Sequence, residues 1–116
     1  MSEKSNRIIS VKKFNLTDAG ARGWFIGDFD RAVFRTKDFE ITYQKNSRGQ
    51  TPSHIHKIVH EITLVVSGSQ VCNGEIFAAG DICMLEPGDI SQIEYLEDTE
   101  VVTIKVPSVP SDKHYL

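Results

Sequence analysis

The sequence lacks several features that would indicate other classes of protein. Its apolar runs fall far short of the roughly 18 residues that a membrane helix requires. Its first residues lack the apolar core and the small-residue cleavage site of a signal peptide. With Lys and Arg at 13, Asp and Glu at 16, and a formal net charge of −3, a nucleic-acid partner is disfavoured. We therefore expect a cytoplasmic protein that binds neither membranes nor nucleic acid.

Cysteine is also scarce. The chain has two, Cys72 and Cys83, and they do not have the C-x-x-C spacing of thiolate zinc sites or redox dithiols. Both lie in β-rich sequence, where a free cysteine is usually a small buried hydrophobic residue. The sequence therefore favours two reduced, buried thiols over a disulfide.

Helical periodicity is nearly absent, whereas β-strand patterns are frequent. Only Leu16–Ala21 has a helical pattern, with Thr17 or Asp18 as N-cap. Elsewhere, short runs of Val, Ile, Thr, Phe and Tyr alternate with clusters of turn-forming residues, which predicts short strands. The expected strands are Ile8–Phe14, Ala32–Arg35, Phe39–Lys45, Ser53–His56, Glu61–Ser67, Gln70–Cys72, Glu75–Phe77, Ile82–Leu85, Gln92–Tyr95 and Val101–Val106.

The spacing of these strands favours one all-β domain. A chain of 116 residues is long enough for a single domain with a modest core. Many short strands favour a sandwich or barrel over a βαβ sheet. The Asn73-Gly74 dipeptide favours a type I′ hairpin because both residues tolerate positive φ. The segment 107–116, which contains two prolines, is expected to run over the surface.

The strand Glu61–Ser67 has one wholly apolar face. Alternation places Ile62, Leu64 and Val66 on that face, and Glu61, Thr63 and Val65 on a mixed one. Because exposed apolar strips are rare on monomers, the apolar face is expected to be covered. Either a second sheet of the same domain or a partner subunit would cover it.

Histidines cluster in one short segment. Residues two apart on a strand point to the same side, so His54 and His56 project together. Glu61 would face away in a continuous strand, but a turn through residues 57–60 returns its carboxylate to the same pocket. Two imidazoles and one carboxylate match the facial triad of non-haem iron(II) proteins. The same set binds Zn, Mn, Ni or Co, so the metal is not identified.

The spacing of these residues resembles the cupin superfamily. Its first motif runs glycine, five residues, His-x-His, three or four residues, glutamate, six residues, glycine. Here Gly49, His54-Ile55-His56, Glu61 and Gly68 follow that order, with only the first gap one residue shorter. In the second motif, counted from Gly80, Gly88 is in register and proline is shifted by one place. The second motif's histidine and asparagine positions hold Ser91 and Tyr95.

The resemblance covers about residues 39–106 and implies a small, RmlC-like jelly-roll barrel of two antiparallel sheets. It implies that His54, His56 and Glu61 are metal ligands in the barrel. The histidine that would supply a fourth ligand is replaced by Ser91, so Gln92, after a shift of one residue, or water would have to take its place. The resemblance also implies a homodimer.

Other side chains are candidates for the pocket. His60 could replace Glu61 as a ligand, although a surface position is the more common one for such a residue. Tyr43 and Tyr95 are candidate hydrogen-bond donors, with packing as the alternative. As catalytic residues we single out His54, His56 and Tyr95.

Three functions are compatible with these residues. The first is a small-molecule-binding cupin with a divalent metal (Fe, Mn, Ni, Co or Zn), which oxidises its ligand as a dioxygenase does. The second is a metal-free epimerase or ketoisomerase of nucleotide-linked sugars, with His54 or His56 as the base. The third is a ligand-binding or sensing module without catalysis. Whether the protein is an enzyme stays open at this point, because one fold hosts many functions.

Overall fold

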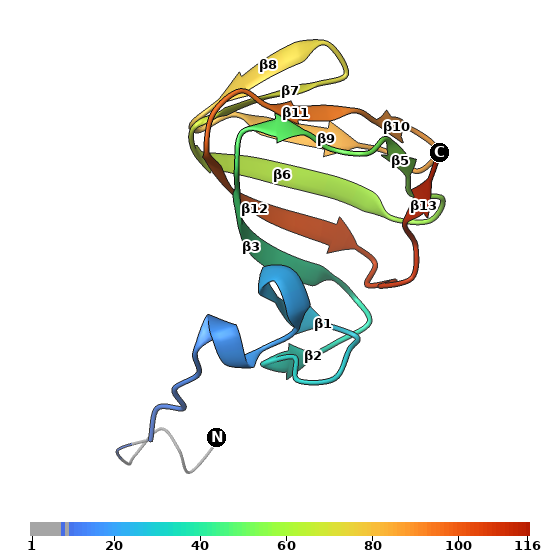
Figure 1. Cartoon of the computed structure of the whole chain (residues 1–116). Helices are drawn as coiled ribbons and strands as arrows, with labels where there is room; N and C mark the ends of the chain where they lie inside the picture. Colours follow the sequence, from blue (N-terminus) through green and yellow to red (C-terminus); the bar gives the residue numbers. More distant parts are fainter. Residues whose placement is uncertain (1–7, 9) are drawn as a thin grey trace.

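The computed structural model describes residue 8 and residues 10–116, which form a β-barrel with one short helical segment at its lower end (Figure 1). Within these residues, none of the helices has the length and apolar character needed to span a membrane. The elements are η2 (Leu16–Asp18), η3 (Ala21–Gly23), β1 (Trp24–Gly27), β2 (Phe34–Arg35), β3 (Glu40–Asn46), β4 (Gly49–Gln50), β5 (His54–Ile55), β6 (His60–Ser67), β7 (Ser69–Cys72), β8 (Glu75–Ala78), β9 (Ile82–Leu85), β10 (Ile90–Ser91), β11 (Ile93–Tyr95), β12 (Thr99–Val106) and β13 (His114–Tyr115).

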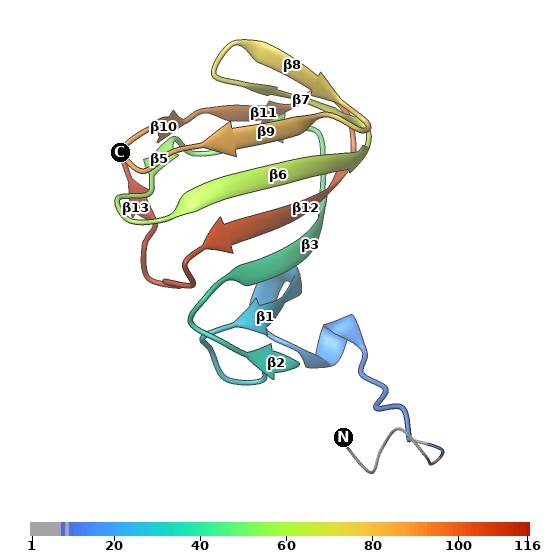
Figure 2. The ribbon, with the colours of Figure 1, turned by 180° about the vertical axis from the view of Figure 1, so that it is seen from behind.

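Two layers of strands enclose the barrel. One layer is a six-stranded sheet in the order β2-β1-β3-β12-β6-β9. The other consists of the sheets β4-β11-β7-β8 and β10-β5-β13, and the four-stranded one lies above the six-stranded sheet in Figures 1 and 2. All pairings except β1 with β2 are antiparallel. The predicted all-β jelly-roll architecture is therefore confirmed.

Most of the expected strands are present, with ends within two residues of those predicted. The exception is Ile8–Phe14, where residues 8 and 10–14 form no strand and Ile9 lies outside the described residues. The short strands β1, β4, β10 and β13 were not expected. The helical segment forms two 3-10 turns, and the cap of the first is Asn15, whose side chain accepts the Thr17 N–H at 3.0 Å.

Strand β6 is oriented opposite to an ordinary amphipathic strand, whose apolar face is the buried one. Its mixed face, with Glu61, Thr63 and Val65, is buried inside the barrel. Its apolar face points outward, and Leu64 and Val66 are 38% and 44% exposed. No second sheet of the described chain therefore buries the apolar face, which leaves a partner subunit as the remaining alternative from the sequence.

The barrel interior is unusually polar. Thr63 and Thr103, on neighbouring strands, share a hydrogen bond of 3.0 Å between their hydroxyls. Both amide atoms of Gln70 and the hydroxyl of Ser91 are buried without a hydrogen-bond partner among the described residues. Valines and the free, buried Cys72 and Cys83 supply the apolar part. Because a buried polar group without a hydrogen-bond partner costs free energy, this interior is better suited to binding another molecule than to forming a hydrophobic core.

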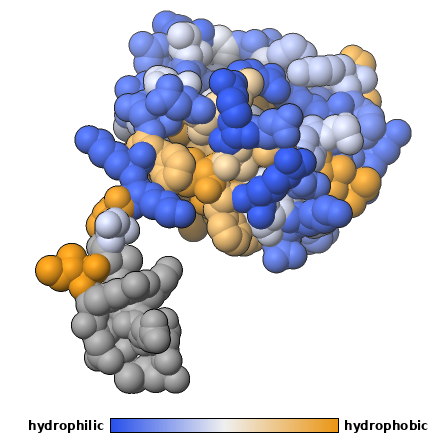
Figure 3. All heavy atoms as spheres, turned by 90° about the horizontal axis from the view of Figure 1, so that it is seen from below, coloured by the Kyte–Doolittle hydropathy of each residue, from blue (hydrophilic) through white to orange (hydrophobic). Residues whose placement is uncertain are grey.

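Hydrophobic surface also lies at the lower end of the molecule. Seen from below, an apolar area is bordered by hydrophilic residues (Figure 3). In the elements of that end, Leu16 and Phe34 are 40% and 61% exposed. The apolar surface of this chain is therefore not confined to the outer face of β6.

The turn between β6 and β7 requires the glycine at its centre, which yields a stability prediction. Gly68 has φ +84°, and a Cβ there would lie 2.5 Å from the Asp98 carbonyl oxygen. Gly80 has φ +93° but open space around it. Backbone strain should lower the free energy of unfolding of both Gly68→Ala and Gly80→Ala by about 1–2 kcal/mol. Gly68→Ala should lose more stability than Gly80→Ala, because its Cβ would also clash with the Asp98 carbonyl oxygen. Urea unfolding of both variants measures this difference. Equal losses would show that the β6–β7 turn can adjust to a side chain.

Candidate metal centre

The two histidines of the first motif lie side by side in the barrel. His54 is on β5 and His56 follows it, and both are buried, with 7% and 3% of their surface exposed. Their ring centroids are 5.0 Å apart with an interplanar angle of 79°. Alternation along the strand accounts for their common direction.

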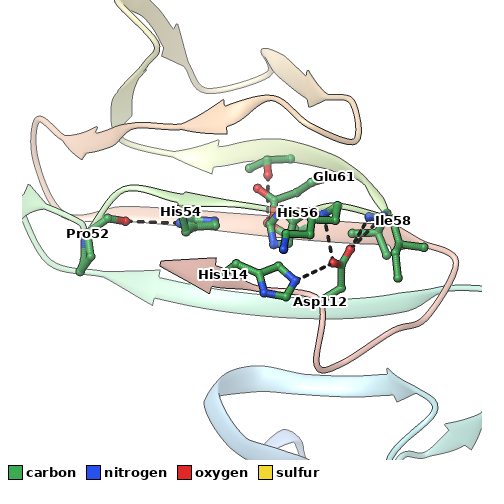
Figure 4. A network of polar contacts seen from close by, with 11 residues as sticks. Pro52, His54, His56, Ile58, Glu61, Asp112 and His114 are labelled. Carbon is green, nitrogen blue, oxygen red and sulfur yellow. Dashed lines mark hydrogen bonds and ion pairs between the residues drawn. The ribbon is translucent and has the colours of Figure 1, made fainter. Parts of the chain in front are cut away.

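Glu61 joins them because the chain turns between His56 and β6. Figure 4 shows Glu61 beside His56, and their Oε2 and Nε2 atoms are 3.6 Å apart. One donor atom from each of His54, His56 and Glu61 lies within 4.8 Å of the other two. These three residues could therefore hold one metal ion between them.

The chemistry of this donor set fits a divalent metal. The Nε2 atom of His56 is buried and has no hydrogen-bond partner in the described part of the chain. Burial lowers the pKa of His54, and burial together with the charge of Lys105 lowers the pKa of His56 to about 4. Both imidazoles are therefore neutral near pH 7, which is the form that binds a metal. Burial raises the pKa of Glu61, so a cation beside it would favour its ionised form.

The second motif meets the first at this centre. Ser91 on β10 is paired with His54 on β5, is 1% exposed, and leaves its hydroxyl without a partner in the described structure. The Gly88 N–H donates a 2.8 Å hydrogen bond to the His56 carbonyl. The position that holds a histidine in the resembling family is therefore adjacent to the centre and is occupied by a serine.

Tyr95 and Lys105 face the same interior. Tyr95 on β11 is paired with the buried Gln70, and burial, with the nearby Glu61 carboxylate, raises the pKa of Tyr95 to about 12. Lys105 is paired with Glu61 across β12 and β6 and lies over the Trp24 ring, 4.9 Å from its centroid. Lys105 is not among the candidates identified from the sequence. The alternation that puts Val101 and Thr103 inside would have indicated it.

Three of the sequence candidates lie elsewhere. Tyr43 is on the face of β3 opposite the buried Thr42, and its hydroxyl donates to the Glu100 carboxylate. His60 is exposed, because it precedes Glu61 on β6 and points to the other side. Gln92 is exposed as well, and its N–H donates to the Asn73 side chain at 2.9 Å. The structure therefore brings together His54, His56, Glu61, Ser91 and Tyr95.

Comparison with known proteins identifies solved structures with a similar fold. No family model and no curated protein matches the sequence. Among solved structures, KdgF from Halomonas sp. is 25% identical over 65% of this chain and 74% of its own, with a TM-score of 0.58. A cupin-2 domain-containing protein from Shewanella frigidimarina is 17% identical over 61% of this chain and 72% of its own, with a TM-score of 0.53.

A variant of Streptomyces Pac13, a nucleoside dehydratase, was solved with uridine. It is 14% identical over 93% of this chain and 92% of its own, with a TM-score of 0.68. The barrel, the meeting of the two motifs and these neighbours define the chain as a protein of the cupin fold. The expected cupin-type fold is thereby confirmed.

The low pKa of His56 predicts an acid-dependent loss of stability in the metal-free protein. Between an unfolded pKa of about 6.5 and a folded pKa of about 4, the unfolded chain binds a proton that the folded one does not. The free energy of unfolding should therefore fall as the pH falls through this window, by up to about 3 kcal/mol. Glu61, whose folded pKa is raised, acts in the opposite direction.

Comparison with His56→Gln isolates the histidine contribution. Urea unfolding of both chelator-treated proteins from about pH 7 to about pH 4.5 should show the wild type losing more stability than the variant. Parallel curves would mean that His56 titrates at the same pH in the folded and unfolded chains.

Proposed function

We propose that His54, His56 and Glu61 hold a divalent metal ion at which a small molecule binds inside the barrel. The observation that carries this proposal is the group of three buried donor atoms within 4.8 Å of one another. The unpartnered Nε2 of His56 and the neutral state of both imidazoles support it. A ligand set of two histidines and one carboxylate suits Fe(II), and Zn, Mn, Ni or Co as well.

The protein side chains around the ion define what could happen to the small molecule. When bound, the metal would supply Lewis-acid chemistry, or redox chemistry with dioxygen if it is iron. Three protein ligands leave positions open for a small molecule and water. Tyr95 stays protonated well above pH 7 and would donate a hydrogen bond. The Ser91 hydroxyl, next to His54, would orient a water or a polar group of the ligand.

Support for a small-molecule ligand is indirect. Pac13, which shares this fold, was solved with uridine. The unpartnered polar atoms of Gln70 and Ser91 show that polar groups line the barrel in this chain. Both observations favour a polar small molecule over a macromolecular ligand.

A metal-free enzyme is the second candidate, and the serine at position 91 is the observation that favours it. Without a fourth side-chain ligand, His54 or His56 would act as a base and Tyr95 as the acid, as in an epimerase or ketoisomerase of sugar nucleotides. A binding module without catalysis would use the same side chains as ligand contacts. Metal content separates the first proposal from both.

The double variant His54→Ala/His56→Ala tests the metal site. Elemental analysis of the purified wild type should find near-stoichiometric Fe, Mn, Ni, Co or Zn, and the double variant should lose it. The barrel should stay folded, because these side chains carry little of the apolar packing. His60→Ala, which changes an exposed neighbour, is the matched control and should keep the metal. A wild type without metal, even after incubation with each ion, would favour the metal-free candidates.

We also infer that the outer face of β6 and β9 pairs with a second copy of the chain. Val66, Ile82 and Met84 on these strands are 44%, 62% and 56% exposed. Burying apolar surface of this kind drives association, and symmetric dimers are the commonest assemblies of identical chains.

Light scattering during size-exclusion chromatography tests this pairing. The wild type should have twice the mass of the chain, and Ile82→Glu combined with Met84→Glu should give a monomer, because charges would be buried in the interface. Ile76→Glu changes an equally exposed residue on β8 and should stay dimeric. A monomeric wild type would contradict the inference.

A further inference from the structure

The turn between His56 and Glu61 is held by a residue from the far end of the sequence. The backbone N–H of Lys57 donates to Asp112 Oδ1 at 3.0 Å. Those of Ile58 and Val59 donate to Oδ2 at 2.8 and 3.0 Å. Figure 4 shows the carboxylate of Asp112 facing this turn, next to His56. One side chain therefore satisfies three consecutive backbone donors.

This contact is strong and shielded. Asp112 is 3% exposed, and its remaining contact is with His114 Nε2, which lies 3.2 Å from Oδ1. Although burial opposes ionisation, the three backbone hydrogen bonds and the one from His114 lower the pKa of Asp112 below its usual value. Hydrogen bonds that involve a charged partner are about twice as strong as neutral ones. Val59 is 1% exposed, so its N–H would lose its partner without this carboxylate.

The rest of the segment 107–116 is tied to the barrel on either side of Asp112. Upstream, the Ser108 hydroxyl accepts the Asp28 N–H at 2.8 Å, and the Ser108 N–H donates to the Lys37 carbonyl at 2.9 Å. Downstream, β13 pairs with β5, which places Tyr115 opposite His54 with their ring centroids 6.2 Å apart. The segment was expected to run over the surface. Instead, it forms a strand beside the candidate ligand His54, and its Asp112 binds the backbone of the turn that follows the candidate ligand His56.

We propose that the segment 107–116 completes the metal centre and that Asp112 is its positioning residue. Asp112 is not in the group of donor atoms within 4.8 Å, so it acts through the backbone of residues 57–59. A strand continued from His56 would turn Glu61 away from the histidines, because Glu61 lies five positions after His56, an odd number. The fixed turn brings the Glu61 carboxylate to 3.6 Å from His56. This inference rests on the proposed metal site.

Binding of Co²⁺ to the full chain tests the proposal. Asp112→Asn keeps the shape of the side chain and one acceptor oxygen, and Asp112→Ala removes both acceptors. Both variants should bind Co²⁺ about 10–100-fold more weakly than the wild type, as is typical when residues behind the ligands are changed. The visible absorption spectrum of bound Co²⁺ should change as well, because it reports the coordination geometry, which a loss of stability alone would not alter.

Asp81→Asn is the matched control. Its carboxylate also accepts a backbone hydrogen bond, from Ala78 at 2.9 Å, but in the turn between β8 and β9. It should leave the affinity and the spectrum unchanged, and thermal unfolding of all variants shows whether each is folded. If Asp112→Ala does not fold, Asp112→Asn carries the test.

The outcomes separate this inference from the proposed function. A wild type that binds Co²⁺, together with a folded Asp112→Asn of equal affinity and spectrum, would overturn the positioning role and leave the metal site in place. Equal weakening by Asp81→Asn and Asp112→Asn would also overturn it, since the effect would then be general destabilisation. A wild type that binds no Co²⁺ would overturn the metal site, and this inference with it.

Discussion

The turn through residues 57–59 is the constraint on which the candidate centre depends. Side chains alternate along a strand, so His54 and His56 point in the same direction without any further constraint. Alternation does not explain why the Glu61 side chain points toward them. Three backbone hydrogen bonds to one buried carboxylate fix the turn that brings Glu61 to them. The geometry of the centre is therefore set by a contact between residues more than fifty positions apart in the sequence.

The polar lining of the barrel follows from how β6 and β12 are paired. Thr63 and Thr103 face each other inside, as do Glu61 and Lys105, while Leu64 and Val66 of β6 face outward. Such an arrangement gives up part of the hydrophobic stabilisation of a small domain, because polar groups occupy the volume that a core would fill. A partner on the outer apolar face would recover part of it, which connects the polar interior with the inferred pairing of chains.

The second motif contributes geometry even though its histidine is missing. The Gly88 N–H donates a hydrogen bond to the His56 carbonyl, and β10 places Ser91 next to His54. A serine hydroxyl is a weak ligand for a transition metal, so this position is open to water or to a polar group of the small molecule. The same barrel is thereby compatible with a three-residue metal site and with chemistry that uses the histidines alone.

The sequence by itself determined the all-β fold, nine of its strands, and the common direction of His54 and His56, because alternation and turn residues are local signals. Spacing in the first motif also indicated Glu61, although not the turn that places it. Only the tertiary structure decided that β6 turns its apolar face outward and that Tyr43 and Gln92 lie outside the barrel. It alone showed Asp112 behind the centre. These features depend on which strands pair and on contacts between distant segments, and no local pattern of residues encodes them.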